Sequence, residues 1–211
     1  LRAVGSLSGI IKEETEESHP ELIPHFETIK GRLMRMDNLL DALLNYTKME
    51  NIHEIVESQS IEVIIHQVIS QIHPGDDVTI HIEAGMPNAL RCSNRLQKVL
   101  FQIINNAIVH NDNSDKRIDI TYSISTENCL LNIRDNGPGI EERYHGKVFE
   151  IFQTLQRRDE KETMGIGLAI AKKIIVDLGG AIQLRSIEGE GAEFTIELPM
   201  KYISTTNVKA Q

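Results

Sequence analysis

Between residues 61 and 198, the spacing of apolar side chains switches repeatedly between steps of three or four and steps of two, and this alternation limits the possible folds more than any other feature. Steps of three and four place side chains along one face of a helix, whereas steps of two place them on one face of a strand. Helical spacing is found over 61–72, over 94–110 and from Gly165 to the pair Gly179 and Gly180, and strand spacing over 78–82, 118–124, 129–133, 182–184 and 194–198. Helices and strands that interleave in this way pack as two layers around one core. The sequence therefore predicts an α+β domain, a two-layer α/β sandwich with a mixed sheet and helices on one face.

A second pattern, with the spacing of packed helix pairs, precedes this domain. Apolar residues recur in a short stripe and then in a longer one, at Val4, Leu7 and Ile11 and at Ile29, Leu33, Met36, Leu40 and Leu43. Residues 13–24 between the stripes are acidic and hold two prolines, which is typical of a connection. An antiparallel hairpin of this size cannot bury both of its faces alone, so we expect it to form a four-helix bundle with a second copy. The predicted organisation is a hairpin over 1–54, the sandwich over 55–202 and a tail over 203–211.

The balance of charges and the lack of long apolar segments argue against two classes of partner. Acidic residues outnumber Lys and Arg by 31 to 22, for a net charge of −9, whereas a nucleic-acid-binding protein needs a basic face. No apolar stretch approaches the roughly 20 residues of a membrane-spanning helix, so we expect no membrane contact from this chain. Cys92 and Cys129 lie in unrelated segments and fit no metal-ligand spacing, which indicates unpaired thiols in a reducing, cytoplasmic compartment.

Two polar motifs carry residues suited to chemistry. On the helix over 94–110, Gln102, Asn106 and Val109 share one face, and an Asn carbonyl in that position can ligate Mg²⁺. The segment from Asp135 to Gly139 follows a buried strand, where an Asp can accept a hydrogen bond from the exocyclic amine of adenine and glycines let the backbone approach the base. Considered separately, a solvated polar strip and a simple turn are the favoured interpretations.

A third motif, Gly165-Ile166-Gly167-Leu168, opens a predicted helix. Glycine-rich backbone that leads into a helix N-terminus forms an anion site, because its N–H groups and the helix dipole both favour phosphate. One Gly-x-Gly by itself is weak evidence. The segment matches neither a Walker A loop nor a dinucleotide-binding fingerprint.

The order of these motifs along the chain is more specific than any one of them. An Asn-bearing helix, a strand, Asp-x-Gly-x-Gly, the segment 148–152, Gly-x-Gly-Leu and a final Gly-x-Gly before the last strand follow one another. This arrangement resembles the ATP-binding domain shared by histidine kinases, type II topoisomerases, mismatch-repair proteins and a heat-shock chaperone family. The resemblance extends from Ile61 to Met200.

Further details resemble the histidine kinases within that group. Residues 149–153, Phe-Glu-Ile-Phe-Gln, are similar to their F box, and residues 165–175 are similar to their second glycine box and its helix, followed by Leu178-Gly179-Gly180. Segments 1–7, 32–36 and 43–47 resemble the dimerisation hairpin. The pattern is most similar to that of bacteriophytochrome-like and related soluble sensor kinases.

The resemblance implies a role for individual residues. Asn106 is expected to ligate Mg²⁺, with Gln102 beside it on the catalytic helix, and Asp135 to read the adenine amine. Phe149 and Phe152 are expected to anchor a lid over 153–164. The pocket residues implied for the base are His110, Gly137, Gly139 and Ile140, and those implied for the triphosphate are Gly165, Ile166, Gly167 and Leu168. The cations Lys147, Arg157, Arg158 and Lys161 are either phosphate contacts or ordinary surface charges.

The implied reaction is transfer of the ATP γ-phosphate, with Mg²⁺, to a histidine imidazole of a phosphoprotein dimer, and then to an aspartate on a response regulator. An upstream sensor domain is also implied. In the family the phosphoacceptor histidine precedes the segment that matches Leu1, and no histidine of this chain is followed by the family's acceptor box. The chain is therefore expected to be a piece of a longer protein that binds ATP without phosphorylating itself.

Several positions depart from the family pattern. Gln102 stands where the family has Asn or a carboxylate, Val109 replaces a basic residue, and His110 replaces an aromatic residue. Thr154 replaces an Arg, and Thr163 occupies the place of a glycine. Together, these departures leave open a slow kinase or one that needs an ordered lid. Two further alternatives are a signalling scaffold that binds nucleotide and transmits conformation, and an ATPase of the topoisomerase or chaperone type. The lack of a Glu at position 102 and the preceding hairpin argue against the ATPase.

Overall fold

The computed structural model describes residues 2–16, 18–48, 58–89, 92–153 and 165–204. The chain divides into two compact units, residues 1–52 and 53–211. The predicted boundary between residues 54 and 55 falls in a segment outside the described residues. Each unit is described by itself below.

The first unit is a helical hairpin of α1 (Arg2–Thr15) and α2 (Ile23–Lys48), joined through the short 3₁₀ helix η1 (Pro20–Leu22). The two helices pack together, and Lys12 of α1 lies 2.5 Å from Glu27 of α2. The predicted connection over 13–24 was wrong at both ends. Pro24 lies in the first turn of α2, where a helix does not need its missing N–H, so it does not delay the start of the helix.

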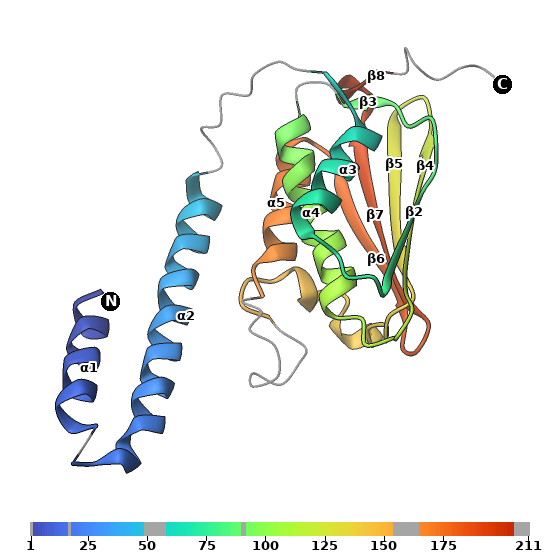
Figure 1. Ribbon diagram of the computed structural model, residues 1–211. Coiled ribbons are helices and arrows are strands. Elements are labelled where there is room, and N and C mark those ends of the chain that lie inside the picture. The colour runs from blue at the N-terminus through green and yellow to red at the C-terminus, as the bar shows by residue number, and fades with distance from the viewer. Residues whose placement is uncertain (1, 17, 49–57, 90–91, 154–164, 205–211) are drawn as a thin grey trace. The chain divides into compact units, whose positions relative to one another are not determined.

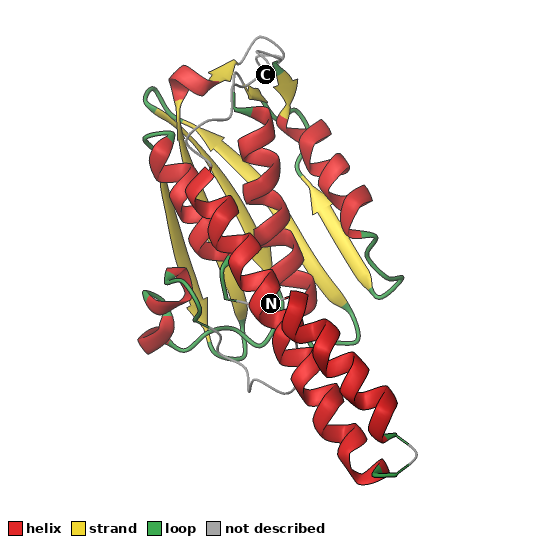
Figure 2. Cartoon of the chain, turned by 90° about the vertical axis from the view of Figure 1, so that its left-hand side faces the viewer, coloured by secondary structure: helices red, strands yellow, loops and turns green. Residues whose placement is uncertain are grey.

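The second unit contains the predicted two-layer sandwich. Its sheet has the strand order β2-β4-β5-β7-β6, with β2 (Val78–Ile82) parallel to β4 (Lys116–Ile124) and all other pairs antiparallel. The remaining strands are β5 (Asn128–Asp135), β6 (Ala181–Ile187) and β7 (Gly191–Pro199). The helices α3 (Ile61–Ile72), α4 (Ser93–Val109) and α5 (Gly167–Asp177) cover one face of the sheet (Figure 1). Figure 2 shows the same layering from the helix side. The predicted fold class is thus confirmed.

The core lies between these two layers and uses the apolar faces that the sequence predicted. The residues of α3 and α4 that are buried are Ile61, Ile64, Ile65 and Val68, and Leu96, Val99, Leu100, Ile103, Ile104 and Ala107. On the sheet, Ile118 and Ile120 of β4 and Leu131 and Ile133 of β5 are buried against them. Asp135 continues the same alternation in β5, so its side chain is on the helix-covered side of the sheet.

A second, smaller sheet was not predicted. It consists of β1 (Gln59–Ser60), β3 (Asn88–Ala89) and β8 (Ile203–Ser204), which are antiparallel and have the order β1-β3-β8. Its third strand lies within the segment predicted as a tail. Strands of two residues are too short to show any periodicity in the sequence.

Among the described residues, no helix combines the length and apolar character that crossing a membrane requires. The described residues also contain no group of His, Cys, Asp and Glu that forms a metal site by itself.

Candidate functional site

The described segments that carry most of the predicted site residues lie at one end of the sandwich. The C-terminal ends of α4 and β5, the turn between β6 and β7 and the N-terminal end of α5 all lie at the lower end of this unit in Figure 1. The packing of α4 against α5 brings two of these segments into contact. This end of the sandwich therefore brings together segments that are far apart in the sequence.

Among the described residues of this site, Asp135 is the one with an ionisable side chain that is largely buried, and 9% of the residue is exposed. Its Oδ1 accepts hydrogen bonds from the backbone N–H groups of Gly137, at 2.8 Å, and Ala192, at 3.3 Å. None of the described residues donates a hydrogen bond to its Oδ2. Burial raises the pKa of this carboxyl, and the two backbone N–H groups offset only part of that rise. The carboxylate is thus held through one oxygen and offers the other as an acceptor.

The backbone around Asp135 is packed too closely for larger residues. A Cβ at Gly137 would lie 2.8 Å from Asp135 Oδ1, and one at Gly139, whose φ is +71°, would lie 2.1 Å from the carbonyl oxygen of Ile187. The backbone N–H of Ile140 donates to Ser186 Oγ at 2.8 Å. The loop after β5 therefore rests directly on the β6–β7 turn.

The start of α5 makes an equally close contact with α4. A Cβ at Gly167 would lie 2.3 Å from Gln102 Oε1, so the Gln102 side chain packs on the backbone of Gly167. Gly165 has φ +63°, and its carbonyl accepts a hydrogen bond from the N–H of Phe152 at 2.9 Å. The N-cap residue of α5, the buried Ile166, makes no side-chain cap hydrogen bond. Within the described part of the chain, no side chain caps the first N–H groups of this helix, which suits an anion site.

Asn106 lies one turn after Gln102 on the same face of α4 and is half-buried. Its side-chain amide forms no hydrogen bond to any residue that the structure describes, whereas its backbone carbonyl accepts the N–H of His110 at 3.0 Å. The helix ends at Val109, and His110 is its half-buried C-cap residue. The amide of Asn106 is thus available to a ligand.

The aromatic residues expected to anchor a lid occupy different environments. The Phe149 ring packs edge-to-face on Phe194, with 6.3 Å between ring centroids, and Lys172 Nζ lies 5.3 Å from the Phe149 centroid. Phe152 is 54% exposed and has φ +68°. Lys147 is exposed and contacts the Tyr144 ring at 5.9 Å. Arg157, Arg158, Lys161, Thr154 and Thr163 lie outside the described residues.

Sequence reasoning missed several residues that shape this site. Ser186 bridges the loop and the sheet, because its Oγ also donates to the carbonyl of Gly191 at 2.6 Å. Asn111, only 3% exposed, lies against Gly137. A buried Asn two residues after an amphipathic helix gives no sequence signal, because its burial depends on a strand that follows later in the chain.

Comparison with known proteins agrees with this arrangement. Residues 92–202 match the family of histidine kinase-, DNA gyrase B-, and HSP90-like ATPases. Phytochrome-like protein Cph1 of Synechocystis sp. is 29% identical over 167 residues, and cyanobacterial phytochrome A of Nostoc sp. is 30% identical over 170 residues. Each match covers 78% of this chain and 22% of the relative, so the chain spans about a fifth of their length.

Solved structures of histidine kinases have the same fold. The mycobacterial sensor histidine kinase MprB aligns with a TM-score of 0.60 and 22% identity over 69% of this chain and 97% of its own. Full-length ShkA in complex with AMPPNP aligns with a TM-score of 0.65 and 20% identity over 89% of this chain and 40% of its own. The chain therefore belongs to the histidine kinase-, DNA gyrase B-, and HSP90-like ATPase family and contains the ATP-binding catalytic domain of a sensor histidine kinase.

Proposed function

We propose that this chain binds ATP with Mg²⁺ and transfers the γ-phosphate to a histidine on a dimerisation hairpin, from which the phosphate passes to an aspartate of a response regulator. The observation that carries the proposal is the Asp135 carboxylate, which has one oxygen held by two backbone N–H groups and the other without a partner among the described residues. A buried, oriented acceptor of this kind suits the exocyclic amine of adenine.

The base lies at the Asp135 end of the proposed site. Gly137 and Gly139 let the loop after β5 pack closely on Asp135 and Ile187. Ile140 and His110, both half-buried, are proposed to flank the base. The triphosphate extends toward α5, where the N–H groups after Gly165 and the helix dipole favour negative charge.

Mg²⁺ suits the second polar group of the proposed site, the side-chain amide of Asn106. Asn106 offers one neutral amide oxygen, and Mg²⁺ in nucleotide sites keeps several water ligands and needs few ligands from the protein. When bound, the metal neutralises charge on the phosphate oxygens. Gln102, one turn earlier and in contact with Gly167, holds the start of α5 against the helix that carries Asn106.

The chain's own residues act mainly by positioning. The unprotonated nitrogen of a neutral imidazole attacks the γ-phosphorus in line, and the N–P bond forms as the bond to the ADP oxygen breaks. The second ring nitrogen then releases its proton to solvent, which restores a neutral ring. Lys147, Arg157 and Arg158 are proposed to contact the phosphates. The exposed apolar side chains of the hairpin, among them Leu7 at 58% and Met34 at 59%, support a homodimer.

A signalling scaffold that binds nucleotide without turnover is the second candidate. It is favoured by Val109, which provides no charge on the helix that carries Asn106. Phosphorylation, by this chain, of a hairpin that carries the acceptor histidine would exclude the scaffold.

The direct test of the proposal is a calorimetric titration with ATP and ADP, with and without Mg²⁺. Micromolar binding that Mg²⁺ strengthens is expected for the unsubstituted chain. Asn106→Ala should reduce the Mg²⁺-dependent gain by at least about tenfold, since even residues that only support a metal ligand have effects of that size. Asn105→Ala is the matched control, because Asn105 is rotated by about 100° around the same helix. Full metal dependence in Asn106→Ala would show that another residue holds the metal.

The raised pKa of Asp135 predicts a pH effect on binding and an opposite effect on stability. As the pH falls through this pKa, Oδ2 becomes protonated and ATP affinity falls. Because the pKa of Asp135 is raised, this loss occurs at a higher pH than the value of about 4 at which a free Asp titrates. A raised pKa in the folded state means that the folded chain binds the extra proton, so Asp135 lowers the free energy of unfolding as the pH rises through that range. Urea unfolding between acidic and neutral pH should show this slope in the unsubstituted chain and not in Asp135→Asn. Parallel curves would contradict the assignment of the titration to Asp135.

A further inference from the structure

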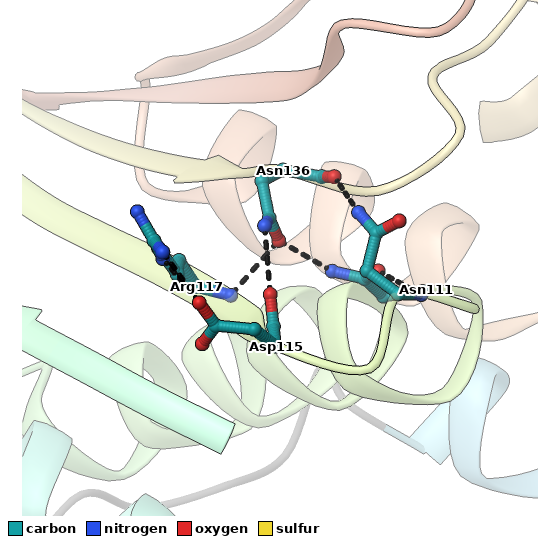
Figure 3. Close-up of polar contacts among 5 residues, drawn as sticks. Asn111, Asp115, Arg117 and Asn136 are labelled. Atoms are coloured by element: carbon teal, nitrogen blue, oxygen red, sulfur yellow. Dashed lines mark hydrogen bonds and ion pairs between the residues drawn. The ribbon is translucent and has the colours of Figure 1, made fainter. Parts of the chain in front are cut away.

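A network of side-chain amides beside the loop after β5 has no role in the mechanism above. The side chain of Asn136, which lies between Asp135 and Gly137, is the centre of this network, and Figure 3 shows it between Asn111, Asp115 and Arg117. Its Oδ1 accepts from Asn111 Nδ2 at 2.8 Å and from the backbone N–H of Arg117 at 2.8 Å. Its Nδ2 donates to the carbonyl of Asp115 at 2.9 Å. Both polar atoms of this amide are therefore used.

The network determines the orientation of both amides. A flipped Asn136 would place its NH₂ group beside two donors and its oxygen beside a carbonyl oxygen, which leaves three hydrogen bonds unmade. Asn111 is fixed in the same way, because its Oδ1 accepts the N–H of Asn113 at 3.0 Å while its Nδ2 donates to Asn136. Because each of the two amides has one orientation that keeps its hydrogen bonds, the pair can fix the position of the backbone at Asn136 relative to Asn111.

Asn111 connects this loop to the helix that carries the proposed metal ligand. It comes two residues after the end of α4 and is 3% exposed. A Cβ built on Gly137 would lie 3.5 Å from Asn111 Cγ and 2.8 Å from Asp135 Oδ1, so Asn111 and the Asp135 carboxyl flank the same glycine. The main chain adds further connections, because Asn136 N–H donates to the carbonyl of Arg117 at 3.2 Å and the Asn113 side chain donates to the carbonyl of Asn136.

We propose that Asn111 and Asn136 are a positioning pair for adenine recognition, a role that rests on the proposed function of Asp135. The pair holds the backbone of residues 135–137 at a set place relative to α4, and so aims Asp135 Oδ2 at the exocyclic amine of the base. Neither side chain touches the nucleotide. The effect of the pair on ATP binding is therefore confined to the hydrogen bond that Asp135 makes with the base.

This proposal predicts a result that a general structural role does not. ATP and purine riboside triphosphate differ only in the exocyclic amine, so the ratio of their dissociation constants measures the contact made by Asp135. For the unsubstituted chain the ratio should be about tenfold or more, as expected for a hydrogen bond to a charged group. Asn111→Ala and Asn136→Ala should lower the ratio to within about threefold of unity by weakening ATP binding, with little change for the analogue.

The experiment uses the 211-residue chain, calorimetric titration with both nucleotides and thermal unfolding of each variant. Asn132→Ala is the matched control, since it removes a half-buried Asn of β5 on the other face of the sheet, bonded to Thr195 at 2.9 Å. This variant should keep the ratio. If Asn111→Ala unfolds below the titration temperature, Asn111→Asp provides the same test, because it keeps the acceptor for Asn113 and loses the donor to Asn136.

The outcomes separate this inference from the proposed function. An unchanged ratio in both alanine variants, or an equal loss of affinity for both nucleotides, would overturn the positioning role. Asp135→Asn, titrated in parallel, tests the base contact itself. If that variant also kept the ratio, or if the unsubstituted chain bound both nucleotides equally, the proposed role of Asp135 would be wrong instead.

Discussion

Asp135→Asn is expected to abolish ATP binding and to leave the chain folded. The asparagine Oδ1 can still accept from the N–H groups of Gly137 and Ala192, so the loop after β5 keeps its two hydrogen bonds. Its NH₂ group, however, replaces Oδ2 and meets the exocyclic amine donor with another donor. Loss of a charge-assisted hydrogen bond together with a buried unpaired donor should weaken ATP binding by about two to three orders of magnitude, measured by calorimetry.

The free energy of unfolding distinguishes this effect from loss of structure. Because burial raises the pKa of Asp135, the charged form costs stability at neutral pH, and a neutral asparagine should be at least as stable. Asp119→Asn is the matched control, since it removes the same charge from an exposed position of β4. Unchanged ATP affinity in Asp135→Asn would show that the base is recognised elsewhere.

Gly191→Ala is expected to cause a large loss of stability. Gly191 begins β7 with φ +89°, and an added Cβ would lie 2.0 Å from the carbonyl oxygen of Asp135, 2.9 Å from its carbonyl carbon and 3.1 Å from Asn136 Cα. All three atoms are backbone, so no side chain can rotate away. The left-handed conformation and the overpacking together should lower the free energy of unfolding by roughly 2–5 kcal/mol, measured by urea denaturation.

Gly189 offers a control for the conformational part of that loss. It has φ +83°, close to that of Gly191, but nothing lies within 4 Å of its added Cβ. Gly189→Ala should therefore cost only the left-handed conformation, about 1–2 kcal/mol. Equal losses in the two variants would show that contact with Asp135 contributes nothing. A folded Gly191→Ala chain would also be expected to bind ATP less tightly, because Asp135 has to move.

Local patterns predicted the elements of the sandwich well. The helix over 61–72 was predicted with the bounds observed for α3, and the buried residues of α4 are those of its predicted apolar stripe. These predictions succeeded because the period of the apolar residues is set by which face meets the core. The hairpin connection was less predictable, since proline is a helix breaker in the interior and is tolerated in the first turn, and the sequence alone does not show which applies to Pro24.

The sequence by itself determined which segments are helices and strands, the layered fold, and the motifs with Asn106, Asp135 and Gly165–Leu168, because each depends on neighbours within a few residues along the chain. Only the tertiary structure decided how these motifs meet. The packing of Gln102 on Gly167, the approach of Gly191 to Asp135 and the bond from Asn111 to Asn136 join segments that are 25 or more residues apart. The physical reason is that a close backbone approach or a buried amide pair depends on strand order and helix packing, which no local spacing encodes.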